Sequence, residues 1–289
     1  MTDAAPADGD PRAIPALPYT LRWRPRGQAP GAHPAAGRGG EGLFQGLVPL
    51  LAQADPRRID IRASLRDPFE AIHARAFAPR RAATVAVMLD LSGSMGFGGV
   101  RGEAAQLAAT VAASAQACGD AFCLLAADAA PRPDLHIPPT RRRGLAREVR
   151  ARIAAATCTG SGSRGLAAAA EHLPRARALV FLVSDFLMPE ADITALLDAL
   201  WRHDIIPVVA RDSRAESAPP RFGLLDLQDA ETGRRRLVVM HPRLHARWQA
   251  QAQARRAALD TLFAARGAAP FHLVDRFDPD ALLDHLARR

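Results

Sequence analysis

The sequence lacks several features that would assign it to well-known classes of protein. It contains no lysine, so all 38 of its basic side chains are arginine, and the lysine-bearing phosphate loop of an ATPase is excluded. Its three cysteines (Cys118, Cys123 and Cys158) are an odd number without Cys-x-x-Cys spacing, which argues against a zinc ribbon or a disulfide framework. No apolar run is as long as a membrane span, and the N-terminus lacks a basic-then-apolar leader. We therefore expect a cytoplasmic protein without a membrane span.

Aromatic residues are also scarce, at 5% of the chain with a single tyrosine, so a platform for stacking nucleic-acid bases is poorly supplied. The net charge of +8 comes from arginines that are scattered apart from two short runs, Arg141 to Arg143 and Arg234 to Arg236. We expect no nucleic-acid partner. In contrast, 48% of the 289 residues are hydrophobic, which is enough for a large globular core.

Composition divides the chain into three parts. Residues 1–41 are rich in proline, glycine and alanine, which predicts a flexible arm. Residues 42–83 carry closely mixed charges, and we expect an N-terminal extension packed on the main domain. Residues 84–289 have the regular pattern of a folded domain.

Buried strands and helices alternate through that domain. Continuous apolar runs of strand length occupy residues 84–89, 122–126, 179–184 and 205–210, and a shorter run occupies 271–274. Helical spacing of apolar residues follows most of them, including a long helix over about 242–266 and a closing helix over 279–288. Residues 224–227 and 237–240 flank a turn and predict a hairpin. The fold class is therefore α/β, an open and mainly parallel doubly wound sheet with helices on both faces.

Oxygen-bearing side chains cluster where two of these strands end. The first strand runs into Asp90-Leu91-Ser92-Gly93-Ser94, and the third ends at Asp185. Hydroxyls in the loop 157–163 approach from a third direction. Ligands of open parallel sheets sit beyond the carboxyl ends of the strands. A set of oxygen ligands with few carboxylates suits Mg²⁺ or Mn²⁺, and such an ion would attract an acidic side chain from a partner.

Asp90-x-Ser92-x-Ser94 after a buried strand, with Asp185 later, resembles the metal-ion-dependent adhesion site of von Willebrand factor A domains. In that family the serine hydroxyls bind the ion directly, and the two aspartates bind through water or, for one of them, directly. A loop threonine usually completes the site. Here the loop offers Thr159, Ser161 and Ser163 for this role. Counting back from the next helix favours Ser163 and side-chain type favours Thr159; our assignment is Ser163.

Two further motifs narrow the resemblance. Arg57-x-Ile59-Asp60-x-Arg62 and Asp229-x-Glu231-Thr232-Gly233 are similar to a bacterial domain-of-unknown-function family encoded beside MoxR-type AAA+ ATPases, which includes MxaS-like proteins of methanol-oxidation clusters. The resemblance implies a metal-dependent interaction module without enzymatic activity. Its partners would be a MoxR-type ATPase and a client enzyme, such as a methanol-dehydrogenase-type protein, that supplies an acidic residue to the metal.

A serine hydrolase is the alternative. Ser92-Gly93-Ser94-Met95-Gly96 resembles a nucleophile elbow, and Ser94, Asp185 or Asp226, and His272 follow the chain order of an α/β-hydrolase triad. However, the oxyanion-hole segment is missing, and the Asp90 carboxylate would oppose a developing oxyanion. The interaction module is therefore the favoured hypothesis.

Overall fold

A six-stranded sheet forms the centre of the molecule in the computed structural model, which describes residues 14–26, 29–35, 42–52, 55–160, 164–213, 220–228 and 233–289. The strand order is β11-β8-β7-β4-β5-β6, and every strand is parallel to its neighbours except β6. The strands are β4 (Thr84–Asp90), β5 (Ala121–Ala127), β6 (Ile137–Thr140), β7 (Leu179–Ser184), β8 (Asp204–Arg211) and β11 (Phe271–Val274). The parallel strands expected from the apolar runs are confirmed.

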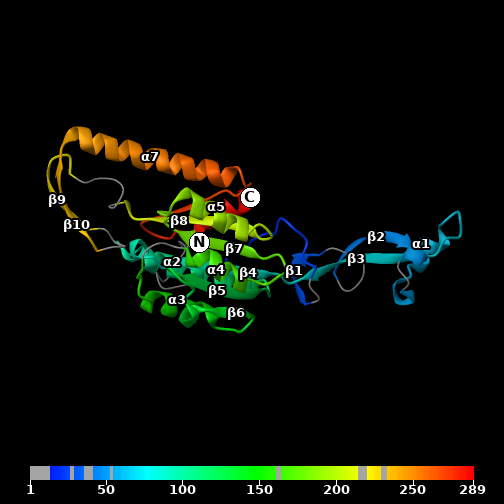
Figure 1. The fold of residues 1–289 in the computed structure, drawn as a ribbon. Coiled ribbons are helices and arrows are strands. Elements are labelled where there is room, and N and C mark those ends of the chain that lie inside the picture. Colours follow the sequence, from blue (N-terminus) through cyan, green and yellow to red (C-terminus); the bar gives the residue numbers. More distant parts are fainter. Residues whose placement is uncertain are drawn as a thin grey trace, which may run out of the picture.

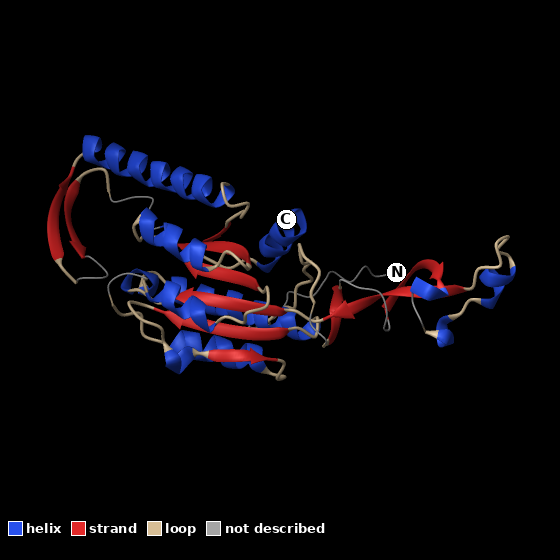
Figure 2. Cartoon of the chain, turned by 45° about the vertical axis from the view of Figure 1, so that its right-hand side comes forward, coloured by secondary structure: helices blue, strands red, loops and turns tan. Residues whose placement is uncertain are grey.

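Helices cover both faces of the sheet, as Figure 2 shows. One face carries α2 (Val100–Ala117), α3 (Leu145–Ala155) and α8 (Pro279–Arg288); the other carries α4 (Gly165–Ala169), α5 (Glu190–Ala199) and α7 (Pro242–Ala264). Strand β4 serves both cores, because Val87 and Leu89 point to the first face and Ala86 and Met88 to the second. Each large aliphatic side chain so buried contributes about 1.5–3 kcal/mol. The expected doubly wound architecture is thus present.

The order of the strands creates a switch point between β4 and β7. From β4 the chain proceeds outward through β5 to β6, and then returns to β7 on the other side of β4 and proceeds outward through β8 to β11. The connections on the two sides therefore diverge above the carboxyl ends of β4 and β7. This is the place where open α/β sheets bind ligands.

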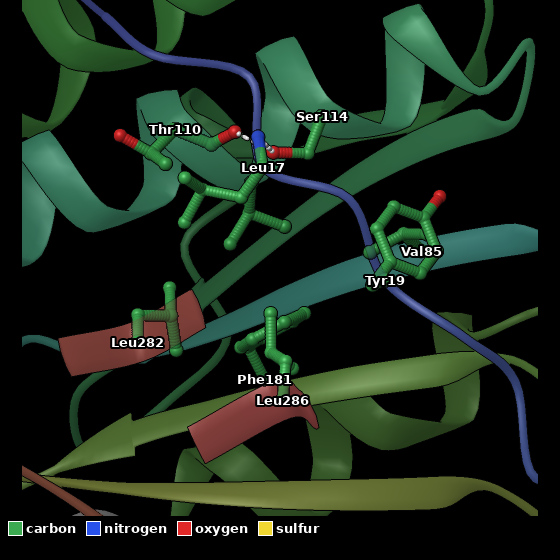
Figure 3. Close-up of a pocket in the computed structure, with 9 residues that line it drawn as sticks. Leu17, Tyr19, Val85, Thr110, Ser114, Phe181, Leu282 and Leu286 are labelled. Atoms are coloured by element: carbon green, nitrogen blue, oxygen red, sulfur yellow. Dashed lines mark hydrogen bonds between the residues drawn. The ribbon is translucent and has the colours of Figure 1, made fainter. Parts of the chain in front are cut away.

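The sequence predicts a flexible segment over residues 1–41, but residues 14–26 of this segment lie against the domain. The Leu17 amide donates to Ser114 Oγ at 2.8 Å, and Leu17 and Tyr19 lie over the first core beside Val85 and Phe181 (Figure 3). The space enclosed there is about 10 Å³, far below the size of a ligand pocket. Burial of a few apolar side chains orders this segment without regular secondary structure.

The extension also differs from expectation, because much of it projects from the domain instead of packing on the sheet (Figure 1). Strands β1 (Pro30–Pro34), β2 (Gly42–Pro49) and β3 (His73–Arg81) form a separate antiparallel sheet in the order β1-β3-β2. Between β2 and β3 lie η1 (Leu50–Ala52), η2 (Pro56–Arg58) and α1 (Ile61–Leu65). Only Ala82 and Ala83 separate β3 from β4, so the hairpin of β2 and β3 extends away from the amino end of the central sheet. We call this hairpin and its tip, residues 42–81, the arm; it is distinct from the N-terminal segment of residues 1–41.

A second projection lies at the opposite end of the molecule from the arm (Figure 1). Strands β9 (Gly223–Gln228) and β10 (Arg235–Met240) pair antiparallel, which confirms the expected hairpin, and β10 leads into α7. The remaining short helices are η3 (Gly93–Gly96), η4 (Pro133–Leu135) and η5 (Ala170–His172). Of the helices that the structure describes, none combines the length and the apolarity needed to cross a bilayer.

Candidate functional site

The two aspartates predicted from the sequence lie at the switch point of the sheet. Asp90 is the last residue of β4 and is almost completely buried, whereas Asp185 directly follows β7 and is half-buried. The register that pairs Leu89 with Val183 brings the two strand ends level. The carboxylates are close enough for the charge of Asp185 to raise the pKa of Asp90.

The two serines join these aspartates into one connected set. The Ser92 amide donates to Asp90 Oδ1 at 2.9 Å, which turns the chain out of β4 into η3. The hydroxyls of Ser92 and Ser94 lie 3.2 Å apart, and the Ser94 hydroxyl is near enough to the Asp185 carboxylate to lower its pKa. The structure therefore brings together four of the five residues predicted as metal ligands.

Ser184 is not among the predicted ligands, but its side chain orients one of them. Its hydroxyl donates to Asp90 Oδ2 at 2.6 Å and accepts from the Phe186 amide at 2.9 Å. It thus fixes the Asp90 carboxylate and the start of the following loop at the same time. A serine as the last residue of a buried strand is the only signal in the sequence, and it is indistinguishable from an ordinary strand residue.

Burial raises the pKa of both carboxylates of the site. It raises the pKa of Asp90 to about 6, although the Ser184 hydrogen bond opposes the shift. Burial also raises the pKa of Asp185, opposed mainly by the Ser94 hydroxyl and less by the Leu187 amide and the charge of Arg255. Within the described parts of the chain, no basic side chain forms an ion pair with Asp90. A cation is the group that this arrangement would accommodate.

Hydroxyls, and not further carboxylates, would have to complete such a site. In the described residues, no three side chains of His, Cys, Asp or Glu type are grouped so that they could hold a metal ion. Two carboxylates with neutral hydroxyls form a weakly charged set of hard oxygen donors, which fits Mg²⁺ or Mn²⁺ better than zinc.

The loop after α3 borders the site, and it contains the three candidates for the last ligand, of which Ser161 lies outside the described residues. The Thr159 amide donates to the Leu91 carbonyl at 3.2 Å, so Thr159 lies beside the turn between Asp90 and Ser92. Its hydroxyl bonds to Asp128 Oδ2 at 3.5 Å. Ser163, our assignment from the sequence, lies outside the described residues, so that assignment stays a prediction.

Helix α7 holds the loop that follows Asp185. Phe186 has a positive φ of 52°, which is uncommon for a residue with a side chain, and its buried ring packs edge-on against Phe263 of α7 at 5.1 Å. Arg255 Nη2, also on α7, donates to the carbonyls of Phe186 and Met188 at 2.7 and 3.1 Å. These contacts fix the backbone of a strained loop and so position Asp185.

Two apolar side chains are exposed next to the ligand set. Phe97 follows the serine turn and Leu187 lies two residues after Asp185, and more than half of each is exposed. Large apolar groups beside a polar centre exclude water from a contact that covers both.

The triad of the alternative hydrolase is not assembled. His272 lies on β11, three strands and roughly 14 Å across the sheet from β4, and its Nε2 pairs with Asp260 Oδ1 at 3.4 Å. Asp226 lies on the projecting hairpin and pairs with Arg235. Ser94 therefore has neither of these residues as a neighbour, and its hydroxyl lies within hydrogen-bond distance of the Ser92 hydroxyl instead.

The sequence of the chain is similar to a known protein family and to a bacterial relative. Residues 54–258 match the model of the family described as "Protein of unknown function DUF58". A Paracoccus denitrificans protein named "Uncharacterized protein in moxR 3'region" is 41% identical over 104 residues, which is 36% of this chain and 99% of that protein.

Similar solved structures include BatB from Bacteroides thetaiotaomicron, with a TM-score of 0.43, 9% identity, and coverage of 72% of this chain and 100% of that one. An aerotolerance-related membrane protein from Bacteroides fragilis has a TM-score of 0.43 and 11% identity, covering 72% and 98% of the two chains. A von Willebrand factor type A protein from Catenulispora acidiphila has a TM-score of 0.35 and 17% identity, covering 46% and 34%. The expectation of a cytoplasmic protein is contradicted here, because one of these neighbours is described as a membrane protein.

Proposed function

The chain belongs to the DUF58 family of proteins of unknown function, and from that premise we propose that it is a metal-dependent protein-interaction module with a von Willebrand factor A-like fold. One observation carries the proposal. Asp90, Ser92, Ser94 and Asp185 converge in one connected set at the switch point of the sheet, with two raised pKa values and no basic side chain paired with Asp90 among the described residues.

The chemistry of this donor set favours a bound Mg²⁺ or Mn²⁺ that still attracts negative charge. Ser92 and Ser94 would hold the ion through neutral hydroxyls, with Asp90 and Asp185 behind them and Thr159 or Ser163 as the remaining donor. An ion held mainly by neutral oxygens gains from a further charged oxygen ligand. An acidic side chain of a partner protein supplies it, and the exposed Phe97 and Leu187 favour a partner whose acidic residue has apolar neighbours.

The partner we propose is a MoxR-type AAA+ ATPase. The Paracoccus denitrificans relative is named for its position in the moxR 3' region, and it is 41% identical to this chain over 104 residues. Together they would act in the maturation or assembly of a client enzyme, and a methanol-dehydrogenase-type protein is the first client to test.

The metal is tested by titrating Mg²⁺ and Mn²⁺ into the purified protein in a calorimeter. The wild-type protein should bind one ion, whereas Asp90→Ala and Ser94→Ala should lose the binding heat and keep their far-ultraviolet circular dichroism. Asp284→Ala is the matched control, because that aspartate is exposed on α8 and lies outside the ligand set. Equal ion binding by wild type and Asp90→Ala would refute the proposed ligand set.

The partner is tested by capturing the MoxR-type ATPase of the same genome on the immobilised protein. Capture should require Mg²⁺ and should fail in EDTA or with Ser94→Ala. Capture that persists undiminished in EDTA would show that the interaction does not use the metal. Fluorophosphonate labelling of Ser94 tests the hydrolase alternative, and we expect no covalent adduct.

A further inference from the structure

The tip of the arm exposes large apolar side chains to an unusual degree. The tip comprises the described residues between β2 and β3, and five of its large hydrophobic side chains are at least half exposed: Leu51 (99%), Phe69 (89%), Leu65 (82%), Ile61 (68%) and Ile72 (50%). They belong to η1, to α1 and to the stretch between α1 and β3, and Figure 1 shows α1 at the far end of the arm. Soluble surfaces rarely gather so many large apolar groups in one place, so the tip has the composition of a docking surface.

In the tip, the carboxylates are mostly paired, whereas several arginine side chains form no ion pair with the described residues. Three of its carboxylates are each paired within the arm, and the N···O distances are 2.9 Å for Asp55–Arg58, 2.8 Å for Asp60–Arg75 and 2.5 Å for Asp67–His73. Arg57, Arg62 and Arg66 are exposed, and none of them forms an ion pair with the described residues. Glu70 is the acidic side chain of the tip that is left to oppose them. The tip therefore offers apolar side chains together with free guanidinium groups.

We propose that this tip docks on an anionic phospholipid bilayer. Aliphatic and aromatic side chains enter the boundary between headgroups and acyl chains, and arginines beside them bind lipid phosphates. The tip is convex, because Leu51, Leu65 and Phe69 are each more than four-fifths exposed. A rigid protein partner would need a complementary hollow for each of them, whereas a fluid bilayer adapts to a convex tip. This difference favours a lipid surface over a protein.

The geometry of the arm fits this role. Strand β2 has eight residues and spans roughly 26 Å, and this length of hairpin separates the tip from the sheet domain. The arm leaves the amino end of β4, and the ligand set lies at the carboxyl end of the same strand. The metal edge therefore faces away from a bilayer bound at the tip.

Vesicle sedimentation with the full-length protein tests the proposal. The wild type should pellet with vesicles of phosphatidylcholine mixed with phosphatidylglycerol, less with pure phosphatidylcholine, and less in high salt. The double variant L65D/F69D should weaken binding by at least roughly tenfold, because two inserting side chains are lost. Arg62→Glu with Arg66→Glu should remove the preference for phosphatidylglycerol. Phe222→Asp is the control, since Phe222 is also largely exposed (71%) but lies outside the arm.

Insertion itself is measured with Phe69→Trp and vesicles of brominated lipid. The added tryptophan should be quenched, whereas the three native tryptophans of the wild type should not. The proposal is overturned if the wild type fails to pellet with phosphatidylglycerol vesicles, or if L65D/F69D pellets as well as the wild type. It is also overturned if light scattering shows a dimer that Phe69→Asp dissociates while vesicle binding is absent, because the tip then joins two copies of the chain. Mg²⁺ binding at Asp90 is unaffected by any of these results.

Discussion

Replacing Asp90 with asparagine should stabilise the metal-free protein at neutral pH, although it removes a proposed ligand. The folded protein holds the proton of Asp90 more tightly than the unfolded chain, because burial raises the pKa from 3.8 to about 6. The unfolded chain therefore loses this proton first as the pH rises. Stability from this group is fully present below about pH 4, falls between pH 4 and 6, and stays reduced above.

The magnitude follows from the two pKa values. One pKa unit corresponds to about 1.4 kcal/mol, so the difference between 3.8 and about 6 destabilises the folded protein by about 3 kcal/mol at pH 8. Asparagine removes that charge and keeps an acceptor for the Ser92 amide. Its NH₂ group replaces the oxygen that accepts from Ser184, and the disturbed hydrogen bond costs about 1 kcal/mol. A net stabilisation of about 2 kcal/mol remains.

Urea unfolding followed by circular dichroism, in EDTA, measures this difference. At pH 8 the variant should be more stable than the wild type, and at pH 4 the advantage should disappear or reverse. Added Mg²⁺ should stabilise the wild type by about 2.7 kcal/mol at a hundred times its Kd and leave the variant unchanged. A gap between the two proteins that does not depend on pH would refute the assignment of a buried, uncompensated charge to Asp90.

Three other substitutions test separate parts of the structure. At the amino end of the sheet, the Asp120 carboxylate accepts hydrogen bonds from the Tyr19 hydroxyl, the His33 ring and the Ala83 amide. Asp120→Ala should therefore lower the free energy of unfolding by about 3–5 kcal/mol in urea and leave ion binding unchanged. Arg255→Met releases the loop after Asp185 and should lower Mg²⁺ affinity roughly fivefold in calorimetry while the Tm changes little. Gly165→Ala places a Cβ 2.6 Å from the Ala130 carbonyl carbon and should destabilise by about 1–3 kcal/mol in thermal unfolding. An unchanged value in any of the three contradicts the contact concerned.

The central sheet could be predicted because its strands are buried on both faces. Such strands are continuous apolar runs, as in Thr84–Asp90 and Leu179–Ser184, and the polar residue at the end of each marks the edge where ligands bind. The convergence of Asp90, Ser92, Ser94 and Asp185 follows from these strand ends alone. The residues that orient them do not, since Arg255 reaches the loop of Phe186 from 69 positions further along the chain.

The arm could not be predicted, for a different reason. Leu65 and Phe69 have the side chains of core residues, and nothing in the sequence distinguishes an apolar residue that faces the core from one that faces a partner. For the segment around Leu17 the sequence prediction was wrong in the opposite sense, because it expected a flexible chain where the segment is ordered. Its composition is that of a disordered chain, yet one hydrogen bond to Ser114 and a few buried side chains are sufficient to order it.

The positions of the two surfaces bear on how the protein could act. Strand β4 begins where the arm leaves the domain and ends at Asp90, so the base of the arm and the ligand set lie at opposite ends of one strand, and the apolar tip lies further away at the end of the arm. Binding at one end therefore does not obstruct the other. A module bound to lipid through Phe69 would present its metal edge, with Phe97 and Leu187, to a partner on the side away from the bilayer. If a single acidic protein bound both ends at once, it would have to extend along the whole sheet, and substitutions at the two ends would then weaken its capture together. If the two ends bind separate ligands instead, Phe69→Asp should leave metal-dependent capture of the ATPase intact.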